Sequence, residues 1–152
     1  YTLGLRRASM VVHTACSYSK VAVHLEANSL RNQESDLALF GGVKILLAPN
    51  LSIKITKARM LAADGRCNSF DATANGYVRS DCCGVVELKR LCQAIRDGYN
   101  VLALIRGSAI NQDGASARLT VPSGPAQGAV VRQALINAGI KRQEVSYIEA
   151  HG

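Results

Sequence analysis

A single cysteine, Cys16, stands between a short β-branched run at residues 9–14 and a stretch with helical spacing. A cysteine at a helix start is placed to react, because unpaired backbone N–H groups and the helix dipole favour the thiolate, which is the nucleophilic form. The same N–H groups can bind an oxyanion during acyl transfer. Free cysteines are also among the most buried residue types, so a packing role for Cys16 is the alternative.

Three histidines are available as the imidazole that a nucleophilic cysteine usually needs: His13, His24 and His151. His24 lies two turns into the expected helix, which favours a packing or surface role. His13 is three residues before Cys16, and side chains at that spacing in a strand point to opposite faces. His151 follows an apolar run in EAHG, and ligands of layered α/β folds bind at strand ends. His151 is therefore the preferred candidate.

The five cysteines show neither C-x-x-C spacing nor a histidine at metal-ligand spacing. Adjacent Cys82 and Cys83 can form a disulfide only through a strained ring, and two thiolates alone hold zinc poorly. We therefore expect five free thiols, no metal site, and the reducing environment of a cytoplasm.

Composition predicts a globular chain. Its 152 residues, 48% hydrophobic and 19% charged, are enough for one buried core and argue against disorder. No apolar run has the length of a membrane span and the start lacks a signal peptide, so we expect a soluble intracellular protein. The first residue is not Met and the chain stops at YIEAHG, which predicts an internal piece of a longer protein.

The net charge of +7 raises the question of a polyanionic partner. The basic residues are scattered, however, and the five tyrosines and two phenylalanines do not interleave with them as a base-stacking surface requires. Nucleic-acid binding is therefore disfavoured, and a basic binding module stays as an alternative whose affinity for polyanions would fall steeply with salt.

Strand and helix patterns alternate along the chain, which predicts an α/β layered fold with a mixed or parallel sheet. The apolar run at 35–43 has the character of a strand buried on both faces. Residues 64–84 are turn-rich and expected at the surface. The other expected strands are 9–14, the start of 84–98, 100–114 and 145–152; the expected helices follow Cys16 and occupy 49–61, the end of 84–98 and 122–139.

The helix after Cys16 is predicted to be amphipathic. Val21 and Leu25 share one face, whereas Lys20, His24 and Arg31 share the other, which predicts solvent on that side.

Residues 122–139 carry the clearest helix signals. Ser123 can cap the N-terminus, Pro125 suits the first turn, and Gly139 can end the helix.

Seven segments together resemble the ketosynthase domain of modular type I polyketide synthases, and they cover almost the whole chain in the family's order. The segments are TACS, DLALFGGV, KARMLAADGRCNSFDATANGYVR, GVVELKRL, IRGSAINQDG, GPAQGAVVRQAL and YIEAHG. NQDG and Glu149 are similar to the polyketide branch more than to discrete fatty-acid synthases. The resemblance implies the thiolase-like layered αβαβα fold with only its middle portion present, so that residues 1–152 form a partial ketosynthase domain truncated at both ends.

The resemblance also implies chemistry. Cys16 would accept an acyl group from the phosphopantetheine of an acyl carrier protein, and a malonyl-type extender would then decarboxylate and condense with it. His151 would polarise the extender's thioester and stabilise its enolate. The family's second histidine and its lysine would lie beyond Gly152, so the fragment alone is expected to be inactive. No cofactor would bind directly, and the intact parent would be a homodimer.

Five residues depart from the family's pattern. His13 replaces an acidic residue, Tyr18 and Lys20 replace small or apolar ones, and burying an unpaired ammonium at Lys20 is costly. Ser80 and Cys82 replace glycines, which predicts positive φ at these positions. Two alternatives therefore stay open beside the condensing enzyme: a non-catalytic ketosynthase-like scaffold and a fatty-acid 3-oxoacyl-carrier-protein synthase.

Overall fold

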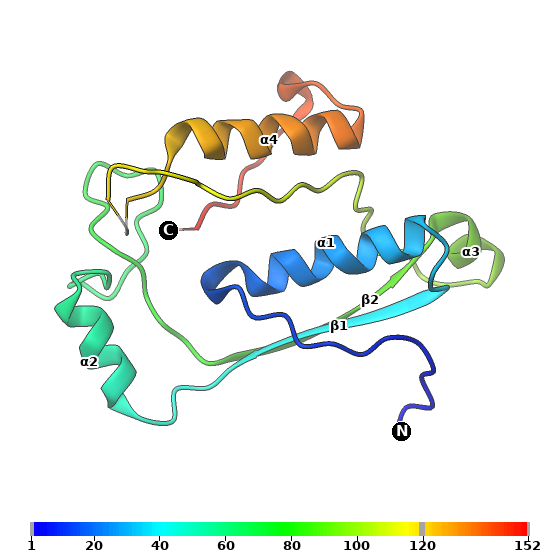
Figure 1. Cartoon of the computed structure of the whole chain (residues 1–152), viewed down its shortest axis with the longest axis horizontal. Helices are drawn as coiled ribbons and strands as arrows, with labels where there is room; N and C mark the ends of the chain where they lie inside the picture. The colour runs from blue at the N-terminus through cyan, green and yellow to red at the C-terminus, as the bar shows by residue number, and fades with distance from the viewer. Residues whose placement is uncertain (1, 119–120, 152) are drawn as a thin grey trace. The chain divides into compact units, whose positions relative to one another are not determined.

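The computed structural model describes residues 2–118 and 121–151. In chain order its elements are η1 (Ala15–Ser17), α1 (Tyr18–Arg31), β1 (Leu37–Lys44), α2 (Pro49–Lys57), β2 (Cys82–Lys89), α3 (Leu91–Arg96), α4 (Gly124–Ala138) and η2 (Arg142–Glu144) (Figure 1). The two strands pair in one sheet. None of the helices in the described ranges has the length and apolarity of a membrane span.

The chain divides into two compact units. The first consists of Tyr1–Phe40 and Val85–Glu144, and the second of Gly41–Gly84 and Val145–Gly152. The boundary between the units crosses each strand, so β1 and β2 each have residues in the two units.

In the first unit, α1 buries a different face from the one its sequence predicts. The buried residues of α1 are Ala27 and Leu30, at 7% and 5% exposure, whereas Leu25 is 39% exposed. The prediction of a Val21–Leu25 core face is wrong at Leu25, because the buried residues Ala27 and Leu30 of α1 line a cavity together with residues of β2 and α3. Lys20 is exposed, which confirms the polar face at that position.

Arg90 joins the end of α1 to the start of β1. Its Nη1 donates to the carbonyl oxygens of Leu30, at 2.8 Å, and of Ser35, at 2.7 Å. The Leu30 carbonyl oxygen also accepts from the Gln33 N–H at 3.2 Å, so Arg90 adds a further bond at the end of the helix. Arg90 also pairs with the Asp36 carboxylate, which accepts from Gln93 as well. Hydrogen bonds from Gln93 and then Arg90 lower the pKa of Asp36 below its usual 3.8.

Helix α4 has the ends that its sequence predicts. The Ser123 hydroxyl accepts from the Ala126 N–H at 3.4 Å, and Gly139 has the left-handed φ of 63° that ends the helix. Gly98, with φ of 74°, likewise follows α3 as predicted.

Residues 107–113 run alongside α4 (Figure 1), and one glycine permits the close approach. A Cβ placed on Gly107 would lie 2.4 Å from the backbone nitrogen of Ala138 and 2.7 Å from the carbonyl oxygen of Ala134. No side chain fits there. Further along, the Asn111 amide donates to the carbonyl oxygen of Ala126 at 2.8 Å, and Asp113 accepts from the Ser123 N–H at 3.0 Å.

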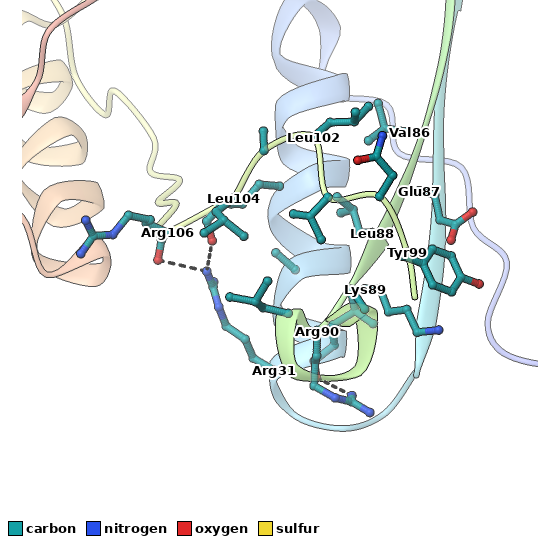
Figure 2. A pocket seen from close by; sticks show the side chains of 18 of the residues that line it. Arg31, Val86, Glu87, Leu88, Lys89, Arg90, Tyr99, Leu102, Leu104 and Arg106 are labelled. Atoms are coloured by element: carbon teal, nitrogen blue, oxygen red, sulfur yellow. Dashed lines mark hydrogen bonds between the residues drawn. The ribbon is translucent and has the colours of Figure 1, made fainter. Parts of the chain in front are cut away.

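A cavity of about 780 Å³ lies among α1, β2, α3 and residues 99–106 (Figure 2). Its lining is mainly apolar, and Leu102, at 90% exposure, and Leu104, at 57%, are among the residues that line it. At its edge Lys89 pairs with Asp97 at 2.7 Å and lies 4.0 Å from the centre of the Tyr99 ring.

Three predicted strands are absent from the described residues: 9–14, 100–114 and 145–151; Gly152 lies outside the described residues. A strand is defined by ladder bonds to a neighbour, and in the described residues these segments have none. The strand at 35–43 is confirmed as β1, but its burial on both faces is wrong. Within β1 only Ala38 is buried and Val43 is 59% exposed, because two-sided burial needs a covering layer on each face.

In the second unit, α2 begins at the predicted Pro49 but ends at Lys57, four residues before the predicted end. The turn-rich 64–84 segment is mostly exposed, as predicted. The expectation of positive φ at Ser80 and Cys82 is wrong, since β2 begins at Cys82 and extended backbone needs no positive φ. Among the described residues, the non-glycine positions with positive φ are Ala15, Gln33, Arg59 and Phe70.

We predict that Gly107→Ala lowers the free energy of unfolding by about 1–3 kcal/mol, the usual range for overpacking a filled site. The added methyl group would collide with the α4 backbone, which has no side-chain freedom to move away. Gly84→Ala is the matched control, because a Cβ there meets nothing within 4 Å, and it should stay within about 0.5 kcal/mol. Chemical denaturation measures both, and equal stabilities for the two variants would contradict the close approach.

Asp36 gives stability a dependence on pH. Its pKa is lower in the folded state than the 3.8 of a free side chain, so its contribution is present above pH 3.8 and is lost as the pH falls through the folded pKa. Asp36→Asn should therefore be less stable than the parent at neutral pH, and the difference should shrink in acid. Thermal unfolding of both forms between pH 7 and pH 3 tests this; a difference that stays constant over the range would show that the ionised carboxylate contributes nothing.

Candidate active site

Cys16 lies in the short helix η1, at the joint with α1 that the sequence predicts, and its side chain is exposed. The Ser17 hydroxyl binds the Thr14 carbonyl oxygen at 2.9 Å and makes no capping bond to α1. The first turn of α1 also contains no acidic residue. The positive end of the helix dipole therefore lies beside Cys16 without a carboxylate to neutralise it, an environment that favours an anion.

The residue before the cysteine has a strained backbone. Ala15 has φ of 54°, in the left-handed region that costs an L-residue about 1–2 kcal/mol. Such residues gather at functional sites, where the surrounding structure holds them in place. This turn carries the chain into α1 with Cys16 at the bend. Nothing in the sequence pattern indicates it, since alanine has no preference for positive φ.

In the second unit, His151 is exposed and stacks on Tyr77, with ring centroids 6.1 Å apart and ring planes inclined by 26°. The backbone of Tyr77 is fixed by a parallel bridge to Leu61. Its N–H donates to the Met60 carbonyl oxygen and its carbonyl oxygen accepts from the Ala62 N–H, both at 3.1 Å. The His151 ring is thus supported by a side chain whose backbone is held on both sides.

Gly76 makes this bridge possible. Its φ is +150°, and a Cβ there would lie 2.5 Å from the Ala62 nitrogen and 2.6 Å from the Leu61 carbonyl carbon. Sequence reasoning did not identify Tyr77. The available signal was an aromatic residue directly after a glycine in an otherwise polar, turn-rich stretch.

The carboxylate of Glu149, two residues before His151, is held by Tyr147. The Tyr147 hydroxyl donates to Glu149 Oε2 at 2.7 Å, and this bond raises the pKa of Tyr147 above its usual 10.0.

The other two histidines have different surroundings. His13 is exposed. His24 is half-buried, and its ring nitrogens bind the Ser108 hydroxyl at 2.8 Å and the Asn28 amide at 3.0 Å. Of the packing or surface role predicted for His24, the packing alternative fits, and the prediction of solvent on the face of Lys20 and Arg31 is wrong at His24.

All five cysteines are free and exposed. Cys67 accepts a hydrogen bond from the Val78 N–H at 3.2 Å. Over residues 2–118 and 121–151, no group of three or more Cys, His, Asp or Glu side chains is arranged to hold a metal ion.

Two family models match the chain in succession. The β-ketoacyl synthase N-terminal domain matches residues 1–94, and the β-ketoacyl synthase C-terminal domain matches residues 102–152. The first match includes Cys16 and its helix, and the second includes Ser108, α4 and His151.

Curated relatives are similar over the whole chain. One subunit of the phenolphthiocerol/phthiocerol polyketide synthase of Mycobacterium tuberculosis is 53% identical over 152 residues, which are 100% of this chain and 7% of the relative. Another subunit of this synthase from the same species is 52% identical over 152 residues, 10% of its length. The chain thus spans a tenth or less of these relatives.

Solved structures show the same fold. The oxazolomycin ketosynthase domain OzmH KS7 of Streptomyces albus superposes with a TM-score of 0.91 at 38% identity, over 96% of this chain and 26% of that chain. The ketosynthase from module 6 of the bacillaene synthase of Bacillus subtilis gives 0.88 at 41% identity, over 93% and 26%.

The mixed helix-and-strand architecture is therefore part of the thiolase-like α/β fold of ketosynthase domains, as the sequence resemblance predicts. Since the two family models together account for both units and for both candidate residues, the chain belongs to the β-ketoacyl synthase family.

Proposed function

We propose that residues 1–152 are a partial ketosynthase domain of a polyketide synthase, in which Cys16 is the acylated nucleophile and His151 the first catalytic histidine. The observation that carries the proposal is the surroundings of Cys16: an exposed thiol, directly after the strained Ala15, at an α1 start that has neither a side-chain cap nor an acidic residue. The solved ketosynthases are about four times longer, which supports the partial domain.

In the first half-reaction, the Cys16 thiolate attacks the thioester carbonyl of an acyl group carried on the phosphopantetheine of an acyl carrier protein. Negative charge develops on the carbonyl oxygen, and backbone N–H groups at the start of α1 are the donors that stabilise it. The carrier's thiolate leaves and takes up a proton, and the acyl group remains on Cys16.

In the second half-reaction, a malonyl-type extender on a carrier protein loses carbon dioxide and its thioester becomes an enolate. The His151 imidazole donates a hydrogen bond to the developing enolate oxygen. The enolate carbon attacks the acyl-Cys16 carbonyl, the carbon–sulfur bond to Cys16 breaks, and a β-ketoacyl thioester leaves on the carrier. Tyr77 contributes by holding the plane of the His151 ring.

The proposal also includes the partner, the oligomeric state, the cellular compartment and the absence of a directly bound cofactor. Acyl carrier protein is the partner, the intact parent is a homodimer in the cytoplasm, and no cofactor binds directly. Relatives named as polyketide synthase subunits support this reading over a discrete fatty-acid synthase. We also propose that the 152-residue chain alone forms no β-ketoacyl product, because His24 is engaged by Ser108 and Asn28 and so does not replace a second catalytic imidazole.

We predict that Cys16 is the only cysteine acylated when the intact ketosynthase domain that contains this chain is incubated with an acyl-pantetheine thioester. Peptide mass mapping should place the adduct on Cys16, and Cys16→Ala should abolish it. Cys92→Ser is the matched control, since Cys92 is also exposed and lies near the start of a helix, but in the six-residue α3. An adduct on Cys67, Cys82, Cys83 or Cys92 would contradict the assignment, and no adduct at all would favour a non-catalytic scaffold.

Substitution of Tyr77, which supports His151, should affect condensation and leave the acylation of Cys16 unchanged. Tyr77→Leu removes the stacked ring, so condensation should slow by about tenfold or more, the scale on which misplaced catalytic groups act. Acylation of Cys16 should keep its rate, because the proposed role of His151 begins afterwards. Tyr77→Phe keeps the ring and is the matched control. Rapid-quench measurement of both steps tests this, and equal losses in acylation and condensation would rule out a role specific to His151.

A further inference from the structure

Three polar side chains of α1, spaced by three or four residues, extend toward the segment that contains Gly107. His24 binds Ser108, Asn28 binds His24, and Arg31 binds carbonyl oxygens of the same segment. The Arg31 bonds, 3.3 Å to Ile105 and 3.4 Å to Arg106, are drawn in Figure 2, where the guanidinium group points away from α1 toward Arg106.

The donors and acceptors in this row can be assigned one after another. Arg31 carries only donors, so the Asn28 atom 3.4 Å from its Nη1 is the amide oxygen. The Asn28 Nδ2 group then faces His24 Nε2 at 3.0 Å and donates to it. His24 Nε2 must therefore be the unprotonated nitrogen. The proton of the neutral ring lies on Nδ1, which donates to the Ser108 hydroxyl at 2.8 Å.

Ser108 is also bonded to α4. Its carbonyl oxygen accepts from the Asn137 amide of α4 at 2.9 Å. Its neighbour Gly107 lies against the α4 backbone at Ala134 and Ala138, where no Cβ fits. One residue of the extended segment is thus bonded to α1 through its side chain and to α4 through its backbone.

Among the described residues, the buried apolar contacts of α1 lie away from the end next to Cys16. Only Ala27 and Leu30 of α1 are buried, and both lie in its C-terminal half. A small patch of apolar contact resists separation but is non-directional, and so determines the rotation and the axial position of a helix poorly. The hydrogen bond between His24 and Ser108 is directional. Of the three polar residues His24, Asn28 and Arg31, His24 is the nearest to Cys16 in the sequence. Cys16 precedes His24 by eight residues, and the part of this span within α1, from Tyr18 to His24, is about 9 Å at the rise of an α-helix.

We infer that His24 is a positioning residue: its Nδ1–H tautomer, fixed by Asn28, ties α1 to Ser108 and thereby sets the placement of Cys16. The inference rests on the proposed function for the role of Cys16. His24 does not touch the reacting atoms; it acts through the helix that begins after the nucleophile.

The first measurement is spectroscopic and needs no substrate. In the ¹⁵N-histidine-labelled ketosynthase domain that contains this chain, the His24 ring, assigned by its loss in His24→Asn, should show a protonated Nδ1 and an unprotonated Nε2 at neutral pH. Asn28→Ala should remove the hydrogen bond at Nε2. A protonated Nε2, in either the other tautomer or the imidazolium, would overturn the inference.

The second measurement is the rate of Cys16 acylation by an acyl-pantetheine thioester. His24→Leu should lower the maximal rate by about tenfold, with a smaller change in KM, because the thiol is displaced while the thioester still binds. His24→Asn keeps a donor near the position of Nδ1 and should recover most of the loss. Ser108→Ala should lower the rate in the parent but have no further effect in His24→Leu, as expected for two partners of one bond.

Leu25→Ala is the control for a general loosening of α1, since Leu25 neighbours His24 but is 39% exposed, and it should acylate at the parental rate. If His24→Leu also acylates at that rate, this inference fails and the proposed function stands. If the parent itself is not acylated on Cys16, the proposed function fails and the inference fails with it.

Discussion

The first unit depends on one backbone contact, the approach of Gly107 to α4. Because no Cβ fits between Gly107 and the backbone of Ala138, the extended segment lies closer to the helix than packed side chains allow. That approach brings the Ser108 carbonyl oxygen within reach of Asn137 and presents the Ser108 hydroxyl to His24. The hydrogen-bonded connection between α1 and α4 therefore depends on the absence of a side chain at Gly107.

Among the described residues, hydrogen bonds to backbone carbonyls hold several of the elements together. In residues 2–118 and 121–151, the buried hydrophobic residues are four alanines and one leucine: Ala27, Leu30, Ala38, Ala62 and Ala94. Alanine side chains bury little area, and their contribution to burial is correspondingly small. Two arginines supply directional contacts instead, Arg90 at the end of α1 and Arg31 at residues 105–106. Three of the leucines that line the nearby cavity, Leu91, Leu102 and Leu104, are exposed.

Structural features formed by a few neighbouring residues were predictable from the sequence, whereas features that join distant residues were not. The ends of α4 were predicted from Ser123 and Gly139 because capping is completed within a few residues. The strand expected at 100–114 was not found, because its existence depends on a partner outside the segment. In the candidate site, the joint at Cys16 was predictable from the change of periodicity. The bond between His24 and Ser108 was not, since it joins residues 84 positions apart.

Both candidate catalytic groups are supported by the same kind of contact. In one unit Gly107 allows the approach that anchors α1, and in the other Gly76 allows the bridge that holds Tyr77 against His151. Contacts between backbones do not depend on the identity of the surrounding exposed side chains. Of the five residues that depart from the family's pattern, four are exposed, namely His13, Lys20, Ser80 and Cys82, and Tyr18 is half-buried. Since none of them takes part in either glycine contact, these departures are compatible with the positioning of Cys16 and His151.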